Sequence, residues 1–200
     1  MNTITLAGKV ASAPELRFVC LDGENGRFIP CTQGFYCFEI EVKRASGIID
    51  RIPVRMSLGN YNAKRPKVGD YISFKGAIKN YRTEEKKKVL FVKYLDEQEY
   101  IKDTNYALLD GNICSLSEPR VTPFGRQIVD GVIAVDGGLN KFYLDCIFWE
   151  QDIEKLGNYH KGMSIKFLAR LQSRMYQKPD EDFSRTAYDI CVTKILEKDR

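Results

Sequence analysis

The stretch Val68-Gly69-Asp70-Tyr71-Ile72-Ser73-Phe74 returns 93 residues later as Lys161-Gly162-Met163-Ser164-Ile165-Lys166-Phe167. In both copies a glycine precedes a short run rich in apolar residues. The same shift places Ile40 and Val42 on Ile133 and Val135, and it places Ile52 and Val54 on Asp145 and Ile147. A shift that stays constant over such a distance indicates an internal repeat, so we expect two copies of one structural unit.

The two copies differ in length near their starts. Leu6-Ala7-Gly8-Lys9-Val10 matches Leu109-Asp110-Gly111-Asn112-Ile113 at a shift of 103 residues, which indicates an insertion in one loop. The polar, acidic stretch at residues 96–105 is typical of a linker. The expected organisation is therefore a first domain of residues 1–97, a linker of residues 98–105 and a second domain of residues 106–200.

Strands dominate both copies. Apolar side chains alternate at period two in Tyr36–Val42 and in Leu144–Phe148, which is typical of half-buried strands. One helix per copy is expected between the third and fourth strands, as at Gln151–Leu156, with Gly157 directly behind it. This pattern predicts an all-β fold of two tandem OB-folds, which are five-stranded Greek-key barrels.

The composition is typical of folded domains outside membranes. The 200 residues include 44% apolar and 12% aromatic residues, enough for packed cores. No run approaches the roughly 18 consecutive apolar residues of a membrane span. The start at Met1–Ile4 lacks the basic head and the apolar stretch of a signal peptide. We therefore expect a cytoplasmic protein that does not contact a membrane.

Charge is distributed unevenly along the chain. The net charge is +4, from 31 Lys and Arg against 27 Asp and Glu. Residues 1–104 hold 18 of the basic and 13 of the acidic residues, whereas residues 105–200 hold 13 and 14. A basic surplus confined to the first half permits a polyanionic partner there without requiring one.

The sequence offers little support for catalysis, a cofactor or a metal. The six cysteines form no Cys-x-x-Cys pair, so neither a zinc site nor a disulfide framework is expected. His160 is interpreted as a surface loop residue, and Asp180-Glu181-Asp182 as a solvated hairpin tip. The motifs GxxxxGK[ST], HExxH and GxSxG are absent. We therefore expect a protein that is not an enzyme, with a metal-dependent nuclease on the same fold as the remaining catalytic alternative.

One strand of the second copy combines cationic and aromatic side chains. Alternation puts four of them on one face: Arg170, Gln172, Arg174 and Tyr176. Leu171 and Met175 lie on the other face, which is expected to pack. Guanidinium groups pair with phosphates, and a tyrosine ring stacks on an unpaired base. The exposed face is therefore a candidate site for single-stranded nucleic acid, with an ordinary solvated strand as the alternative.

The first copy repeats this pattern where the repeat predicts it. Lys79 and Tyr81 face outward, and a basic run follows at Lys86, Lys87 and Lys88. On a hairpin loop beside the barrel this run can contact phosphate, and a merely solubilising loop tip is the alternative.

The third strand of the second copy carries further aromatic residues. Phe142 and Phe148 share one face, and Ile147 and Trp149 share the other. At the 93-residue shift Phe148 matches Arg55, and both side chains can stack on a base. Trp149 is expected in the core because it shares the face of Ile147.

Several motifs together resemble the bacterial-type single-stranded-DNA-binding proteins. In the first copy, Asn2–Val10 followed by Ala13-Pro14-Glu15-Leu16-Arg17 resembles the opening strand and turn of that family. In the second copy, three stretches resemble other parts of the same fold: Arg120–Gly125, Tyr159–Gly162 and Leu171–Tyr176. The resemblance covers most of both copies. It implies sequence-independent binding and protection of single-stranded DNA in replication, recombination or repair.

The resemblance also implies roles for individual residues. It places base stacking on Tyr176, Phe148 and Phe142 and a contact to the DNA backbone on Arg174. The matching positions of the first copy hold Arg55 and Ile49 in place of aromatics and Thr83 at the place of Tyr176, so Tyr81 is the expected substitute there. The full set of expected DNA contacts is Arg17, Arg55, Lys79, Tyr81, Lys86, Lys87, Lys88, Arg120, Phe142, Phe148, Arg170, Gln172, Arg174 and Tyr176.

The resemblance further implies an assembly and a class of partners. A two-barrel branch of the family dimerises, so we expect a homodimer that brings four barrels together. The family usually ends in a glycine-rich tail with an acidic tip, whereas this sequence stops at Glu197–Arg200, so recruitment of partners by such a tail is not expected. The alternative to DNA binding is a scaffold or primosome-like interaction protein that serves replication or conjugation proteins and binds nucleic acid weakly.

Overall fold

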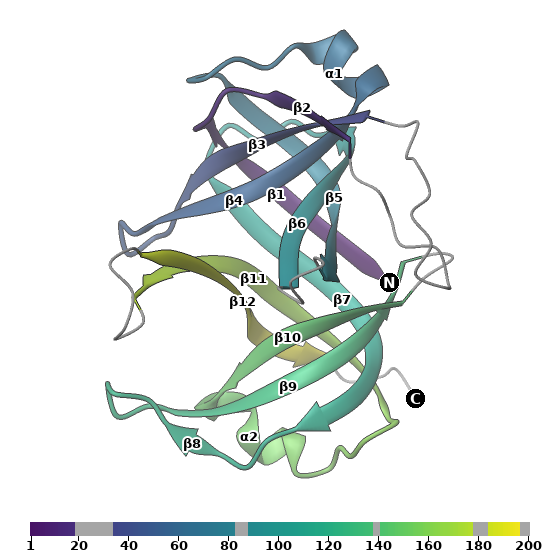
Figure 1. Ribbon diagram of the computed structural model, residues 1–200. Coiled ribbons are helices and arrows are strands. Elements are labelled where there is room, and N and C mark those ends of the chain that lie inside the picture. Colours follow the sequence, from purple (N-terminus) through teal and green to yellow (C-terminus); the bar gives the residue numbers. More distant parts are fainter. Residues whose placement is uncertain (19–33, 83–87, 138–140, 178–183, 197–200) are drawn as a thin grey trace.

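The computed structural model describes residues 1–18, 34–82, 88–137, 141–177 and 184–196. Two strand-rich barrels lie one beside the other along the long axis of the molecule (Figure 1). The first barrel is built from β1 (Asn2–Val10), β2 (Glu15–Phe18), β3 (Gly34–Lys43), β4 (Ile49–Ser57), α1 (Leu58–Lys64), β5 (Tyr71–Arg82) and β6 (Lys88–Glu97). The second is built from β7 (Thr104–Leu116), β8 (Arg120–Val121), β9 (Gln127–Asp136), β10 (Lys141–Trp149), α2 (Glu150–Leu156), β11 (Ser164–Tyr176) and β12 (Arg185–Leu196).

Each barrel closes by the same set of strand pairings. In the first, β1 pairs antiparallel with both β3 and β5, and β4 pairs parallel with β6. In the second, β7 pairs antiparallel with both β9 and β11, and β10 pairs parallel with β12. One short helix precedes the fourth main strand of each barrel. The predicted all-β fold of two tandem OB-folds is confirmed.

A glycine permits barrel closure at equivalent places in the two copies. A Cβ atom on Gly8 would lie 2.2 Å from the Glu41 carbonyl oxygen, and one on Gly111 would lie 2.3 Å from that of Ala134. Both distances are far below van der Waals contact, so β1 can cross β3, and β7 can cross β9, this closely only where the side chain is a hydrogen. The 103-residue shift found in the sequence joins these two glycines.

The two helices have different local origins. Ser57 caps α1, because its hydroxyl accepts a hydrogen bond from the Asn60 amide at 3.3 Å, and Arg65 ends the helix with a left-handed φ of 45°. α2 has acidic residues in its first turn, where their negative charge interacts favourably with the positive end of the helix dipole, and Gly157 follows its last residue. The helix expected at Gln151–Leu156 is present one residue longer.

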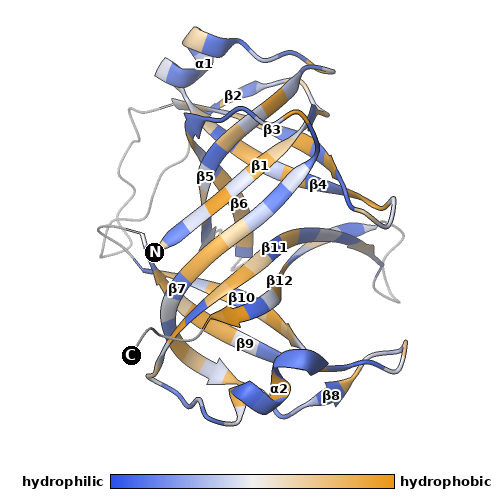
Figure 2. Ribbon diagram, turned by 180° about the vertical axis from the view of Figure 1, so that it is seen from behind, coloured by the Kyte–Doolittle hydropathy of each residue, from blue (hydrophilic) through white to orange (hydrophobic). Residues whose placement is uncertain are grey.

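Strand alternation fills two barrel interiors with apolar side chains. Hydrophobic and hydrophilic residues alternate along many of the strands (Figure 2). In the second barrel, the rings of Phe148 and Phe167 meet edge to face at 5.9 Å, and both are fully buried. In the first, Phe74 and Tyr94 pack at 4.9 Å.

The repeat shift is one residue smaller over the third main strand than elsewhere in the second half of each copy. Gly69 and Gly162, 93 residues apart, both have φ of 93°, so the shift holds there. β4, however, ends at Ser57 and β10 at Trp149, each directly before a helix, so these strands match at a shift of 92. A one-residue slip moves every side chain of a strand to the other face. The predicted matches of Ile52 with Asp145 and of Val54 with Ile147 are therefore wrong.

The corrected register reverses the two faces of β10. Leu144 and Cys146 are buried where Ile52 and Val54 are buried in the first barrel. Phe148 matches the buried Met56 and has an exposed fraction of 0%, whereas Trp149 is half-buried on the outer face. The predictions that Phe148 is available for base stacking and that Trp149 belongs to the core are both wrong.

The barrels are joined through one continuous sheet. β1 pairs antiparallel with β7, from Asn2 opposite Leu109 to Ala7 opposite Thr104. Beside this seam, the Asn2 amide exchanges two hydrogen bonds with the backbone of Ile78, and the Asn105 amide does the same with Leu171. The interface therefore has approximate two-fold symmetry within a single chain. Among the described helices, neither is long and apolar enough to cross a membrane.

Candidate nucleic-acid interface

The outer face of the first barrel holds an arginine between two aromatic rings. Arg55, on β4, lies with its guanidinium carbon 4.7 Å from the centre of the Tyr81 ring and 3.9 Å from that of Phe91. It also donates a hydrogen bond to the Tyr81 hydroxyl at 2.7 Å. The parallel pairing of β4 with β6 and the antiparallel pairing of β5 with β6 bring these three side chains together. The result is a pre-positioned platform that combines a cation with π faces.

Lys79 and Phe142 meet across the boundary between the barrels. The Lys79 ammonium lies 4.9 Å from the centre of the Phe142 ring. Burial lowers the pKa of Lys79, and the neighbouring charge of Lys93 lowers it further. Two residues that the sequence placed in separate copies of the site thus belong to one contact between the barrels.

Two other basic residues of the first barrel are engaged in ion pairs. Arg17, on β2, pairs with Glu15 at 2.7 Å, and both side chains are exposed. Lys88, at the start of β6, pairs with Asp145 of the second barrel at 2.6 Å. Exposed pairs of this kind are weak, so a phosphate can compete for either cation. Lys86 and Lys87 lie outside the described residues.

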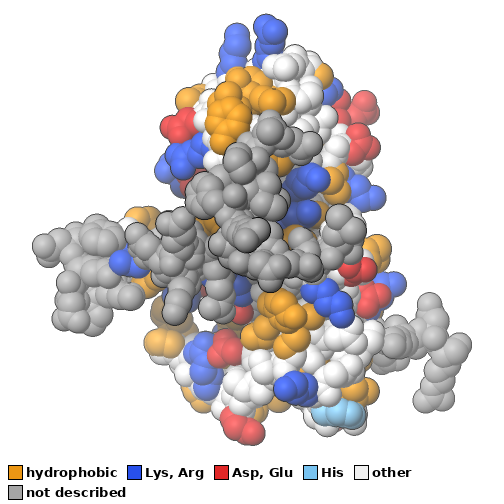
Figure 3. All heavy atoms as spheres, turned by 45° about the vertical axis from the view of Figure 1, so that its right-hand side comes forward, with side chains coloured by type: hydrophobic (Ala, Val, Ile, Leu, Met, Phe, Trp, Pro, Cys, Tyr) orange, Lys and Arg blue, Asp and Glu red, His pale blue; other side chains and the backbone are white. Residues whose placement is uncertain are grey.

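A groove of about 1120 Å³ runs along the outer face of the second barrel, and it is the largest of the described cavities. One wall comes from the second barrel itself and includes Phe124, Ile147, Trp149, Arg174 and Met175. The other wall comes from the β3–β4 hairpin of the first barrel and includes Arg44, Ile48, Ile49 and Arg51. Apolar and cationic side chains therefore line the same space, together with the carboxylates of Glu39, Glu41 and Asp189. Apolar surface beside cations suits a chain of bases linked by phosphates. Basic and hydrophobic side chains are also exposed on another side of the molecule (Figure 3).

Trp149 supplies the aromatic surface of this groove. The Arg126 guanidinium carbon lies 4.4 Å from the centre of its ring, and Arg126 also pairs with Glu150 at 3.2 Å. Phe124 stands at the tip of the β8–β9 turn with an exposed fraction of 93%. Gly125 adopts a left-handed conformation with φ of 79°, which glycine tolerates because it has no Cβ atom. In this conformation its amide donates a hydrogen bond to the Thr122 carbonyl and closes the turn.

The outer face of β11 follows the predicted alternation over most of its length. Arg170 and Arg174 are exposed and Leu171 is fully buried. Gln172 accepts a hydrogen bond from the Cys191 thiol at 3.3 Å, and burial raises the pKa of that thiol to about 12, so it stays protonated at neutral pH. The expectation that Met175 packs is wrong, because the β11–β12 hairpin extends past the barrel and leaves Met175 76% exposed.

Two cations of the second barrel face, Arg174 and Arg120, are paired with carboxylates. Arg174 binds Asp189 at 2.6 Å, and its guanidinium carbon lies 5.7 Å from the centre of the Tyr176 ring. Arg120 binds Asp130 through two nitrogens, at 2.5 and 3.0 Å. Arg55 of the first barrel instead has aromatic and hydroxyl partners.

The structure thus keeps most of the predicted residues near the surface and reassigns several. Phe148 is excluded, and Phe142 lies half-buried under Lys79. Trp149, Phe124, Arg126 and Phe91 had not been predicted as site residues. The sequence did contain a signal for two of them, because Phe124 and Arg126 flank the glycine of a turn beside the expected binding strand.

Metal-binding geometry is not found within the described ranges. No group of three or more His, Cys, Asp or Glu side chains gathers there in a way that could hold an ion. His160 is exposed in the turn before β11.

Comparisons with known proteins agree with this description. Residues 104–196 match the sequence model of the Single-strand binding protein family. The whole chain is similar in fold to the wild-type single-stranded DNA binding protein from Thermus aquaticus, with a TM-score of 0.73, 18% identity and coverage of 100% of this chain and 94% of that one. A deletion mutant of the same Thermus protein gives a TM-score of 0.70 at 18% identity, covering 100% of this chain and 95% of that one. No curated protein matches the chain by sequence.

Proposed function

We propose that this chain, whose residues 104–196 match the sequence model of the Single-strand binding protein family, binds and protects single-stranded DNA largely without sequence preference. The observation that carries the proposal is the pair of stacked cation–ring platforms, one on each barrel. Arg55 with Tyr81 and Phe91 forms the first, and Arg126 with Trp149 forms the second. Such platforms stack on any base and neutralise phosphates, and neither activity depends on base identity.

The remaining contacts of the proposed site come from the strands around these platforms. In this proposal Arg120, Arg170 and Arg174 bind phosphates. Arg120 and Arg174 first release their carboxylate partners, Asp130 and Asp189, so that a phosphate can take their place. Tyr176 stacks on a base and Gln172 offers a polar contact at the groove wall. Arg17, Lys79, Lys88 and Phe142 lie around the first platform and along the boundary between the barrels, where a strand that passes from one barrel to the other would meet them.

The proposal includes a homodimer that acts in the cytoplasm in replication, recombination or repair. Its support is the outer face of the central sheet, where Thr3 lies opposite Leu108 and Thr5 lies opposite Tyr106 across the β1–β7 seam. The neighbouring residues Ile4 and Leu109 point into the barrels. Tyr106 leaves a large aromatic surface open on the outer face, where a second copy can pack around the approximate two-fold axis.

Salt dependence tests the electrostatic part of the proposal. With about four neutralised phosphates and a slope of about −0.7 each, affinity for oligothymidine is expected to fall about 50-fold between 50 and 200 mM salt. A fluorescently labelled oligothymidine titrated at both salt concentrations, with duplex DNA of equal length as competitor, measures this. The proposal is contradicted if the affinity does not change with salt concentration, or if duplex DNA displaces the labelled oligothymidine.

A second candidate function is supported by the ion pairs of the second barrel. Because Arg120 and Arg174 are already bound to Asp130 and Asp189, this face is less available to phosphates than its residue types suggest. A scaffold for replication or conjugation proteins, with weak nucleic-acid binding, is consistent with that pairing. Weak oligothymidine binding even at 50 mM salt favours this function.

A further inference from the structure

The two barrels contact each other at two equivalent places outside the central seam. On one side, the side-chain amide of Asn80 on β5 donates a hydrogen bond to the backbone carbonyl of Tyr143 on β10 at 2.6 Å. On the other side, the backbone amide of Arg51 on β4 donates a hydrogen bond to the hydroxyl of Ser173 on β11 at 2.9 Å. Asn80 matches Ser173, and Arg51 matches Tyr143, under the shifts of 93 and 92 residues. Each long hairpin therefore rests on the third main strand of the opposite barrel.

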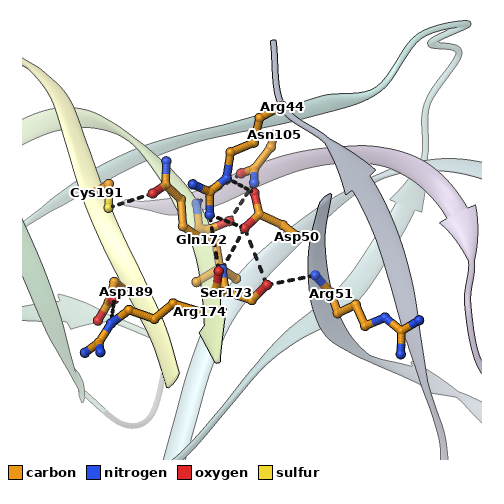
Figure 4. A network of polar contacts seen from close by, with 10 residues as sticks. Arg44, Asp50, Arg51, Asn105, Gln172, Ser173, Arg174, Asp189 and Cys191 are labelled. Atoms are coloured by element: carbon orange, nitrogen blue, oxygen red, sulfur yellow. Dashed lines mark hydrogen bonds and ion pairs between the residues drawn. The ribbon is translucent and has the colours of Figure 1, made fainter. Parts of the chain in front are cut away.

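The contact at β4 contains a buried carboxylate. Asp50 has an exposed fraction of 1%, and its carboxylate accepts the Ser173 amide at 2.7 Å and two nitrogens of Arg44 at 2.6 and 2.8 Å. Arg44 also donates to the Ser173 carbonyl at 3.2 Å. Figure 4 shows Arg44 and Asp50 of the first barrel meeting Ser173 of the second. The matching position of the other contact holds Phe142 in place of Asp50, so this clamp occurs once within the part of the chain that the structure describes.

The clamp fixes the wall that the first barrel adds to the groove. Arg44 and Asp50 flank the turn that carries Ile48 and Ile49, and these two isoleucines are 53% and 51% exposed. Both line the groove that also contains Trp149 and Met175. Burying an ion pair costs desolvation free energy, and here the pair fixes the position of a turn that exposes two isoleucines. A fixed position of these isoleucines is useful if they contact a ligand in the groove.

We infer that the groove is a composite site in which Ile48 and Ile49 of the first barrel contact a single strand stacked on Trp149 of the second. Asp50 is the positioning residue, because it ties this turn to Ser173 without touching the strand itself. Arg51, Arg120 and Arg174 lie around the same space, where they are paired with Glu41, Asp130 and Asp189, and they bind the phosphates of such an occupant in exchange for these carboxylates. This inference rests on the proposed function and adds to it that neither barrel alone provides the complete groove.

The test uses the full chain and labelled oligothymidine at low salt. The double variant Ile48→Ser, Ile49→Ser is expected to bind about tenfold more weakly, because two apolar contacts are lost. Its matched control is Val68→Ser, Leu95→Ser, which removes two comparably exposed apolar side chains of the first barrel outside the groove and is expected to bind as the unaltered chain does. Asp50→Asn, which leaves Arg44 without its counter-charge, is expected to weaken binding similarly and also to lower the melting temperature.

The outcomes separate the composite groove from the proposed function. Loss of affinity in both groove variants, with the control unchanged, supports the inference. If the unaltered chain binds well and the isoleucine variant binds equally well, the composite groove is contradicted while the proposed function stands. If Asp50→Asn lowers only the melting temperature, Asp50 is structural and its positioning role fails. An unaltered chain that binds no oligothymidine contradicts both.

Discussion

Phe148→Ala is expected to cost about 3–5 kcal/mol of folding stability, because it removes a fully buried ring that the barrel cannot replace. The Phe148 ring packs edge to face against Phe167 at 5.9 Å. It also fills the space above Gly131, where an added Cβ would lie 2.8 Å from the ring. Urea unfolding of the variant and of the unaltered chain measures the difference in the free energy of unfolding.

Phe124→Ala is the matched control for this substitution. It removes the same ring from a position that is 93% exposed, so we expect a change in stability within about 0.5 kcal/mol. If Phe148→Ala left stability unchanged and reduced only the affinity for single-stranded DNA, then β10 would have the opposite face in the core and the corrected register would be wrong.

Trp149→Ala is expected to lower the affinity for single-stranded DNA by about 1–3 kcal/mol, or about 5- to 150-fold, while the fold stays intact. The ring is half-buried on the groove wall, and Arg126 lies against it at 4.4 Å, so its position is set before DNA arrives. Anisotropy of a labelled oligothymidine measures the affinity without relying on the tryptophan that is removed.

Tyr100→Ala serves as the control for Trp149→Ala. Tyr100 is an exposed aromatic residue of the segment between the barrels and lies outside the groove. Its removal should leave the affinity unchanged. Equal losses in the two variants would show that aromatic surface anywhere on the protein supports binding, and the assignment of a specific platform to Trp149 would fail.

The architecture was predictable because its signals are local. Alternation at period two, the short helix before the fourth main strand and the repeated glycines each depend on a few neighbouring residues. The pairing of Gly8 with Gly111 under one shift, and of Gly69 with Gly162 under another, was already visible in the sequence. These features are sufficient to predict two barrels of the same kind.

The error on β10 had a specific physical cause. The segment between β3 and β4 differs from that between β9 and β10 by one residue, and sequence matching carried a constant shift across it. Because side chains in a strand alternate, this single residue exchanged the roles of Phe148 and Trp149. The short helix that follows each strand is the better reference point, since Ser57 and Trp149 both directly precede one.

The contacts between the barrels could not be predicted from the sequence. Lys79 and Phe142, or Asp50 and Ser173, are far apart in the chain and meet only because β1 pairs with β7. Arg55 and Tyr81 were predicted as site residues, but their mutual hydrogen bond and the part played by Phe91 depend on three strands lying side by side. Pairwise placement of this kind follows from topology rather than from residue type.

The most direct test of the central claim uses the single tryptophan of the chain. Because Trp149 lines the groove, its intrinsic fluorescence reports on the proposed binding surface without any label. We predict that oligothymidine quenches this emission saturably at low salt, that raised salt restores it, and that duplex DNA of equal length does not displace the oligothymidine. Emission that stays unchanged at saturating oligothymidine and low salt would contradict the account, because no base would then be stacking on the groove wall.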